Sequence, residues 1–179
     1  MNSPLVNLAS KKPARELYLI GFRLDPAAED PQFYTLMGSD GEDERPIARE
    51  GRVLFFRKPS AAARALAACD NGFSQVRPVP RELELLCDIG GALYVANQQD
   101  EDADGLLFDL IAVFDDLLRA VKLAPPPEFA EVLSGVAGSL TEGQEFAGYL
   151  EASGQPRERL EDALLWCVGA AMAKSSWVE

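Results

Sequence analysis

The chain has 179 residues, of which 47% are hydrophobic and 26% charged, and its 17 basic and 29 acidic side chains give a formal net charge of −12. This is the composition of a globular protein that can bury a core without disulfides or a structural metal. The sequence contains no histidine, which excludes Ser-His-Asp and Cys-His catalysis and every metal site that contains histidine.

The first part of the chain is predicted to be a flexible leader at residues 1–14, followed by a strand-rich lobe at residues 15–80. Residues 16–24 and 32–37 are rich in aromatic and branched side chains, as strands are. Residues 46–49 and 52–57 flank Glu50-Gly51, which predicts a hairpin. The alanine-rich segment 60–69 after Pro59 predicts one helix.

The proline-rich segment 77–80 resists helix formation and marks the predicted boundary to a mainly helical, acidic lobe at residues 81–179. A strand is predicted at 82–88, where apolar side chains alternate. Residues 88–97 fit either a helix capped by Asp88 or a hairpin loop between two strands. Their apolar spacing favours the helix.

The remaining segments predict helices with clear ends. Residues 106–121 are apolar nearly all round, Pro125–Pro127 open a helix that runs to about 138, and Thr141 with Gln144 resembles a capping box for the next helix. That helix is expected to stop near Gly154. The last one opens at Pro156 and ends in the apolar run 163–173.

The two apolar helices are predicted to pack on each other, and this places five side chains in a deep core: Leu110, Phe114, Leu117, Leu164 and Val168. The predicted fold class is α+β. A small antiparallel N-terminal sheet with one helix precedes a lobe of about five helices, and together they form one compact unit.

Charge is distributed unevenly along the chain. Residues 1–60 hold nine basic and nine acidic side chains, whereas residues 61–179 hold 8 basic and 20 acidic ones. Because nucleic acids are bound mainly by cations, we expect no nucleic-acid binding, and a basic protein is the expected partner. The alternative is that the acidic second half only keeps the protein in solution.

The cellular location is predicted from what the sequence lacks. The three cysteines, Cys69, Cys87 and Cys167, are far apart, and no CxxC pair is present. The N-terminal residues do not have the order of a signal peptide, and the eleven apolar residues 163–173 are too few to span a bilayer. We therefore predict a cytoplasmic protein that does not enter the membrane.

Asp109 and Asp116 are candidate catalytic residues. They lie seven positions apart and therefore on one helix face, in a segment that is otherwise apolar. In a buried cleft the pKa values of such carboxyl groups rise into a range useful for acid–base catalysis. The alternative is that they form the solvent-facing edge of the helix, together with Asp115 and Arg119.

Residues 100–105 match the DxDxDG opening of a calcium loop, with Asp100, Asp102 and Asp104 as candidate ligands. The closing glutamate should stand at position 111, which is Ile111. We therefore expect weak calcium binding at most, and the alternative is that Asp102 or Asp104 caps the following helix.

Trp177 follows the last apolar run and is expected either to pack against the body of the protein or to contribute to an interface. The function predicted from the sequence is a non-catalytic interaction or regulatory role of the adaptor or toxin-neutralising kind. Asp115, Asp116 and Trp177 are its candidate contact residues, and no cofactor is indicated. A small carboxylate enzyme and a weak calcium-responsive module are the alternatives.

Overall fold

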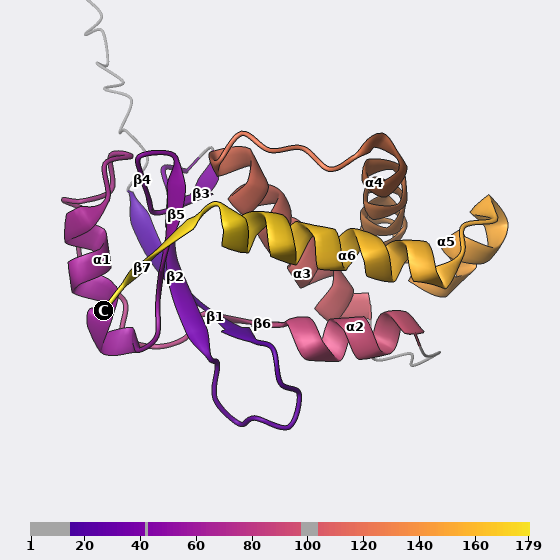
Figure 1. Ribbon diagram of the computed structural model, residues 1–179, viewed down its shortest axis with the longest axis horizontal. Helices are drawn as coiled ribbons and strands as arrows, with labels where there is room; N and C mark the ends of the chain where they lie inside the picture. The colour runs from indigo at the N-terminus through magenta and orange to yellow at the C-terminus, as the bar shows by residue number, and fades with distance from the viewer. Residues whose placement is uncertain (1–14, 42, 98–103) are drawn as a thin grey trace, which may run out of the picture.

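The computed structural model describes residues 15–41, 43–97 and 104–179. Within these residues, seven strands form a single mixed sheet, and α1 lies on one side of it while the other helices lie on the opposite side (Figure 1). The predicted α+β class is confirmed, as is the lobe of five helices.

The strands are β1 (Glu16–Arg23), β2 (Phe33–Ser39), β3 (Glu44–Pro46), β4 (Ala48–Arg49), β5 (Arg52–Phe56), β6 (Leu85–Asp88) and β7 (Ser175–Val178). The helices are a short 3-10 helix (Pro59–Ala61), α1 (Ala62–Ala68), α2 (Ile89–Asn97), α3 (Asp104–Ala120), α4 (Pro127–Thr141), α5 (Phe146–Ser153) and α6 (Arg157–Ala173).

The sheet has the strand order β4-β5-β2-β1-β6, with β3 paired to β2 and β7 paired to β5. The pairs among β1 to β5 are antiparallel, as the sequence predicts. However, β6 runs parallel to β1, and β7 runs parallel to β5. The sheet is therefore mixed rather than wholly antiparallel, because two strands from the second half of the chain join it.

The predicted hairpin at Glu50-Gly51 joins β4 to β5. Both residues have positive φ, 53° at Glu50 and 71° at Gly51. Two successive positive φ angles give a tight turn whose twist matches that of the two strands it connects.

Both faces of the sheet are buried, and successive residues of each strand point to opposite faces. On β1, Ile20 and Phe22 belong to the core beneath the helical lobe, whereas Leu19 belongs to the core beneath α1. On β5, Val53 and Phe55 lie on the lobe side. Such two-sided burial explains why the charged side chains of these two strands, Glu16, Arg23 and Arg52, stand only at the strand ends.

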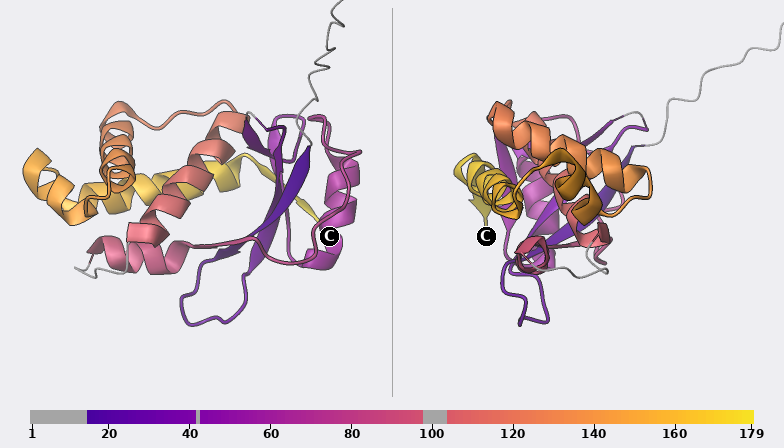
Figure 2. Two further views of the ribbon diagram at one scale, coloured as in Figure 1. Left: turned by 180° about the vertical axis from the view of Figure 1, so that it is seen from behind. Right: turned by 90° about the vertical axis from the view of Figure 1, so that its right-hand side faces the viewer.

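The core beneath α1 is the smaller of the two. Ala62, Ala65 and Leu66 are the buried residues of α1, and Phe73 from the following loop is buried with them. Alanine side chains let the helix backbone come close to the sheet, so one short helix covers this face (Figure 2).

In the helical lobe, α3 packs on α6 as predicted. Leu110, Phe114, Leu117 and Leu164 are all buried, which confirms four of the five expected core positions. Val168 is only partly buried. No helix in the described part of the chain is both long and apolar enough to cross a membrane.

Residues 89–97 are helical, so the helix predicted there is confirmed. The carboxylate of Asp88 accepts a hydrogen bond from the Gly91 amide at 2.9 Å, and it also forms an ion pair with Arg23. A Cβ atom at position 91 would lie 2.4 Å from Oδ2 of Asp88. Glycine at this position therefore makes room for the cap.

The capping box at Thr141 is a wrong prediction. Helix α4 continues through Thr141, whose hydroxyl donates to the Ala137 carbonyl at 2.8 Å. Helix α5 begins only at Phe146, and the Phe146 amide donates to the carboxylate of Asp104 at 3.3 Å. Asp104 thus binds the start of α5, while Asp104 itself is the first residue of α3.

Strand β7 was not predicted, and it brings Trp177 back to the sheet. The centroid of the Trp177 ring lies 5.7 Å from that of Phe33 and 5.8 Å from that of Phe55, and the guanidinium of Arg57 lies 5.0 Å from it. Trp177 nevertheless remains 42% exposed. The ring is thus packed against the body of the protein and still accessible.

Candidate functional site

Helix α3 carries an exposed ridge that separates two hollows of opposite character. Phe108 is 40% exposed, and Ala112, one turn further on, is exposed as well. Ala112 lines both hollows. An apolar groove therefore lies on one side of this helix and an acidic cleft on the other, and they meet at Ala112.

The apolar groove lies between α3, α4 and α6 and has a volume of about 450 Å³. Its apolar lining comes from all three helices: Phe108, Leu110, Ile111, Ala112, Phe114, Leu118, Pro125, Ala130, Leu133, Ala137, Leu164 and Cys167. Asp115 and Ser134 are the polar residues that line it, as far as the described part of the chain goes. Burial raises the pKa of the Cys167 thiol to about 11, so this cysteine stays protonated and unreactive at neutral pH.

The acidic cleft lies between α3 and the sheet and has a volume of about 290 Å³. Four carboxylates of the described residues line it: Glu44, Glu84, Asp109 and Asp116. No lysine or arginine in the same part of the chain lines it. The cleft is therefore a concentrated negative site with apolar walls, which strengthen its field.

The environment of this cleft changes the acidity of the two α3 aspartates that line it, Asp109 and Asp116. Burial raises the pKa of Asp109. Burial also raises the pKa of Asp116, to about 6; Arg119 opposes this shift, while Asp115, Glu44 and Asp43 add to it. Asp116 is thus mostly ionised at pH 7, but it takes up a proton at a higher pH than an ordinary aspartate does.

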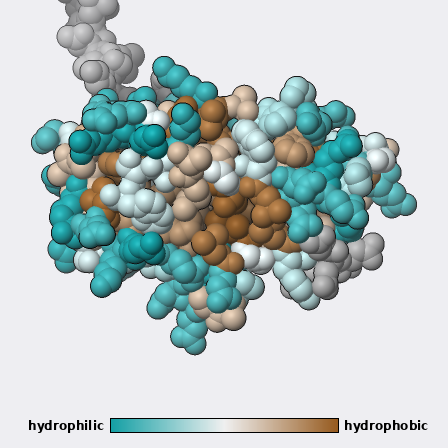
Figure 3. All heavy atoms as spheres, viewed as in Figure 1, coloured by the Kyte–Doolittle hydropathy of each residue, from teal (hydrophilic) through white to brown (hydrophobic). Residues whose placement is uncertain are grey.

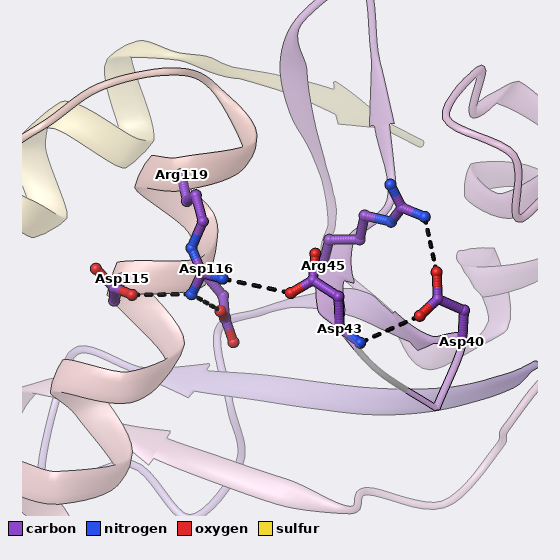
Figure 4. A network of polar contacts seen from close by, with 6 residues as sticks. All are labelled: Asp40, Asp43, Arg45, Asp115, Asp116 and Arg119. Carbon is purple, nitrogen blue, oxygen red and sulfur yellow. Dashed lines mark hydrogen bonds and ion pairs between the residues drawn. The ribbon is translucent and has the colours of Figure 1, made fainter.

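Arg119 is shared by three carboxylates, so its charge offsets only part of the rise in the Asp116 pKa that burial causes. Its guanidinium lies 2.6 Å from Asp116, 2.9 Å from Asp115 and 3.3 Å from Asp43 (Figure 4). A single positive charge cannot neutralise three negative ones. The contact with Asp43 also links α3 to the loop between β2 and β3.

The structure brings together some of the predicted site residues and separates others. Asp109 and Asp116 line the same cleft, whereas Asp115 faces the groove on the other side of the ridge. Trp177 lies on the sheet, away from both hollows. Asp100 and Asp102 lie outside the described residues, and within those residues no acidic or cysteine cluster is arranged to hold a metal.

The sequence analysis missed the other acidic residues of the cleft, Glu44 and Glu84. They come from the β3 strand and from the residue before β6, and pairing in the sheet places them opposite α3. Their positions in the sequence give no indication of a site. The alternation of Glu82 and Glu84 indicates a strand and nothing more.

A further apolar surface lies on α6, where Leu165 is 48% exposed and Val168 and Met172 are partly buried. Figure 3 shows a brown apolar patch over this helix with polar surface around it. The molecule thus exposes apolar surface on α6 as well as in the groove beside α3.

Comparison with known proteins identifies a similar fold. No protein-family model matches the sequence, and no curated protein matches it. Among solved structures, the chain is similar to the one described as "The crystal structure of SatS c-terminal domain in complex with bromine". The TM-score is 0.52 and the sequence identity 16%, and the match covers 90% of this chain and 94% of that chain. At this identity the likeness shows the fold alone.

Proposed function

We propose that this protein is a non-catalytic interaction protein, of the adaptor or toxin-neutralising kind, that binds a basic amphipathic segment of another protein across α3. The observation that carries the proposal is the pairing of the apolar groove with the acidic cleft on the two sides of one exposed ridge. A segment with one apolar and one cationic face matches both hollows at once.

The charge of the site selects the partner. The cleft offers four carboxylates, and Asp115 adds a fifth at the groove. Arg119 already pairs with Asp115 and Asp116. An acidic or neutral amphipathic segment would leave Glu44, Glu84 and Asp109 uncompensated, whereas lysine or arginine side chains compensate them and speed the encounter. The expected partner is therefore a basic protein, and its binding should weaken as salt is added.

A direct test uses a labelled helical peptide with a leucine face and a lysine face, and a second peptide in which glutamate replaces lysine. We expect the lysine peptide to bind in fluorescence anisotropy, with an affinity that falls about tenfold or more between low and high salt. The glutamate peptide should not bind. Equal binding of both peptides, or of neither, would contradict the proposal.

A matched pair of variants locates the binding site. Ala112→Arg places a bulky cation on the wall that both hollows share, and we expect it to weaken the lysine peptide about tenfold or more. Ala67→Arg makes the same change at an exposed position of α1, far from α3, and should leave binding unchanged. A protein captured from the native host is a true partner only if Ala112→Arg releases it and Ala67→Arg does not.

A carboxylate enzyme is the second candidate, because Asp109 and Asp116 do line the same cleft and both have raised pKa values. The cleft volume of about 290 Å³ is at the small end for a ligand site, which favours the interaction role. Hydrolysis of a panel of nitrophenyl glycosides and esters tests the enzyme. Activity that is lost in both Asp109→Asn and Asp116→Asn would establish it.

A further inference from the structure

A hollow of about 540 Å³ lies on the opposite side of the molecule from the helical lobe, where the end of β5, the start of α1 and β7 meet. Arg57 and Lys58 directly follow β5, and Arg64 projects from α1. Trp177 and Glu179 reach the same hollow because β7 pairs with β5 in parallel register. We call it the α1 hollow.

The three cations of the α1 hollow are not neutralised by the protein. None of them has an ion pair within the described residues, whereas Arg23, Arg45, Arg49 and Arg119 each have an acidic partner. Among the described residues, Glu179 is the one acidic residue that lines the hollow. The cationic side chains there outnumber the acidic one and repel each other, and an anionic ligand would relieve that repulsion.

The surroundings extend this positive region. A neighbouring hollow shares Ser60 with the α1 hollow and is lined by Arg77 and Arg81. A chain with a net charge of −12 thus places five cations around the start of one short helix. We infer that the α1 hollow binds a small phosphate-bearing ligand, which Arg57, Lys58 and Arg64 hold by its phosphate oxygens.

The donor set fits a phosphate group. Two guanidinium groups present several N–H donors in fixed planes, and a lysine ammonium and the Ser60 hydroxyl add further donors. The exposed part of the Trp177 ring provides an apolar wall. A volume of about 540 Å³ holds more than a phosphate alone, so a carrier group fits beside it.

The charge of the rest of the molecule restricts the ligand to a small one. At physiological ionic strength, electrostatic interactions decay over about 8 Å, so a small anion in the hollow experiences mainly the local cations. A nucleic acid would extend beyond the hollow and meet acidic surface elsewhere on the molecule. We therefore expect a phosphate monoester or diphosphate to bind and a polynucleotide not to bind.

The test is a titration with inorganic pyrophosphate at low ionic strength, followed by calorimetry and by tryptophan fluorescence. We expect saturable binding with a Kd below about 1 mM and a change in fluorescence. Trp177→Phe should abolish the fluorescence change while calorimetry still detects binding, because Trp166 on α6 lies outside the hollow. Absence of saturation in calorimetry would overturn the inference.

Charge variants with opposite expected effects make the test specific. Arg64→Gln should weaken pyrophosphate binding about tenfold, and Glu179→Gln should strengthen it severalfold. Arg49→Gln, at an exposed position outside the hollow, should change nothing. An equal loss in Arg49→Gln and Arg64→Gln would show a diffuse charge effect and overturn the site.

Competing anions establish the ligand class. Citrate at matched ionic strength should bind more weakly than pyrophosphate, and single-stranded DNA should not displace it. Tighter binding of citrate would mean that the hollow recognises carboxylates. Displacement by DNA at micromolar concentration would mean a nucleic-acid surface. Either result would overturn the inference.

Discussion

The two faces of the sheet are covered in different ways. One face is closed by α1 and by the loop that follows it, which contributes Phe73 and Val76, while the strands supply most of the bulky side chains. The other face is closed by helices that have a thick apolar core of their own, centred on α3 and α6 (Figure 2). A single short helix has little exposed surface that could bind a partner. Several packed helices have a larger solvent-facing surface, on which grooves and clefts can form.

This difference also separates the two candidate sites. The helical lobe carries the groove and the acidic cleft, and the side covered by α1 carries the cationic α1 hollow. The sheet between them is packed on both sides. The molecule therefore offers an acidic surface beside α3 and a cationic surface beside α1.

The largest expected effect tests whether the lobe and the sheet share a single core. Phe114 is 4% exposed, and its ring centroid lies 6.0 Å from that of Phe22 on β1. Phe114→Ala should lower the free energy of unfolding by about 3–5 kcal/mol, because it leaves a cavity between α3 and the sheet. Chemical denaturation measures this.

The control for that experiment lies in the same lobe at a partly buried position. Val168→Ala should cost about 1 kcal/mol, since its side chain is only partly enclosed. A loss below about 1 kcal/mol in Phe114→Ala would mean that the lobe and the sheet are not joined by this core.

An intermediate effect concerns pH and the acidic cleft. Folding raises the pKa of Asp116 from 3.8 to about 6, so the folded state holds the Asp116 proton more tightly than the unfolded state. The charged side chain therefore destabilises the fold as pH rises from about 4 to about 6, and the cost remains above pH 6. Asp116→Asn should raise the free energy of unfolding by about 1–3 kcal/mol at pH 7.5 and by little at pH 4.

Asp115→Asn is the matched control, because Asp115 also pairs with Arg119 but its side chain is 69% exposed. Its effect on stability at pH 7.5 should be small, because exposed ion pairs contribute little. A stabilisation by Asp116→Asn that is equally large at pH 4 would show that the charge of Asp116 is not its origin.

The smallest expected effect concerns the ion pairs on the surface that connect the lobe to the sheet. Arg119→Gln removes the contacts to Asp43, Asp115 and Asp116, yet Arg119 is 56% exposed. Exposed ion pairs contribute little, so the loss should stay below about 1 kcal/mol and vanish in high salt. A loss as large as that of Phe114→Ala would mean that charges rather than apolar packing join the two layers.

The sequence was sufficient for the elements whose signals are local. The strands β1 and β2, predicted from their aromatic and branched residues, the Glu50-Gly51 turn, and the apolar helices around Leu110 and Leu164 are all present. Each of these depends on residues close together in the chain, where periodicity and turn chemistry decide the structure.

The errors arose where distant parts of the chain decide the outcome. Ser175–Val178 forms a strand because it pairs with the free edge of β5. A segment of four residues is too short for its sequence pattern to predict a strand. Thr141 resembled a helix cap, but its hydroxyl bonds back to Ala137 and the helix continues. The pairing of Asp109 with Asp116 was predictable from helical spacing, whereas Glu44 and Glu84 reach the cleft only through the sheet.

The position of β7 has a consequence for how the chain is made. A ribosome completes residues 15–80 long before residues 175–178, so β5 must wait with one edge unpaired while the entire helical lobe is synthesised. An unpaired strand edge is a template for aggregation. Val53 and Phe55, which are buried in the folded protein, are exposed at this stage and can take part in aggregation. Productive folding therefore depends on the last strand arriving, and the nascent chain is the form of this protein that has most need of protection.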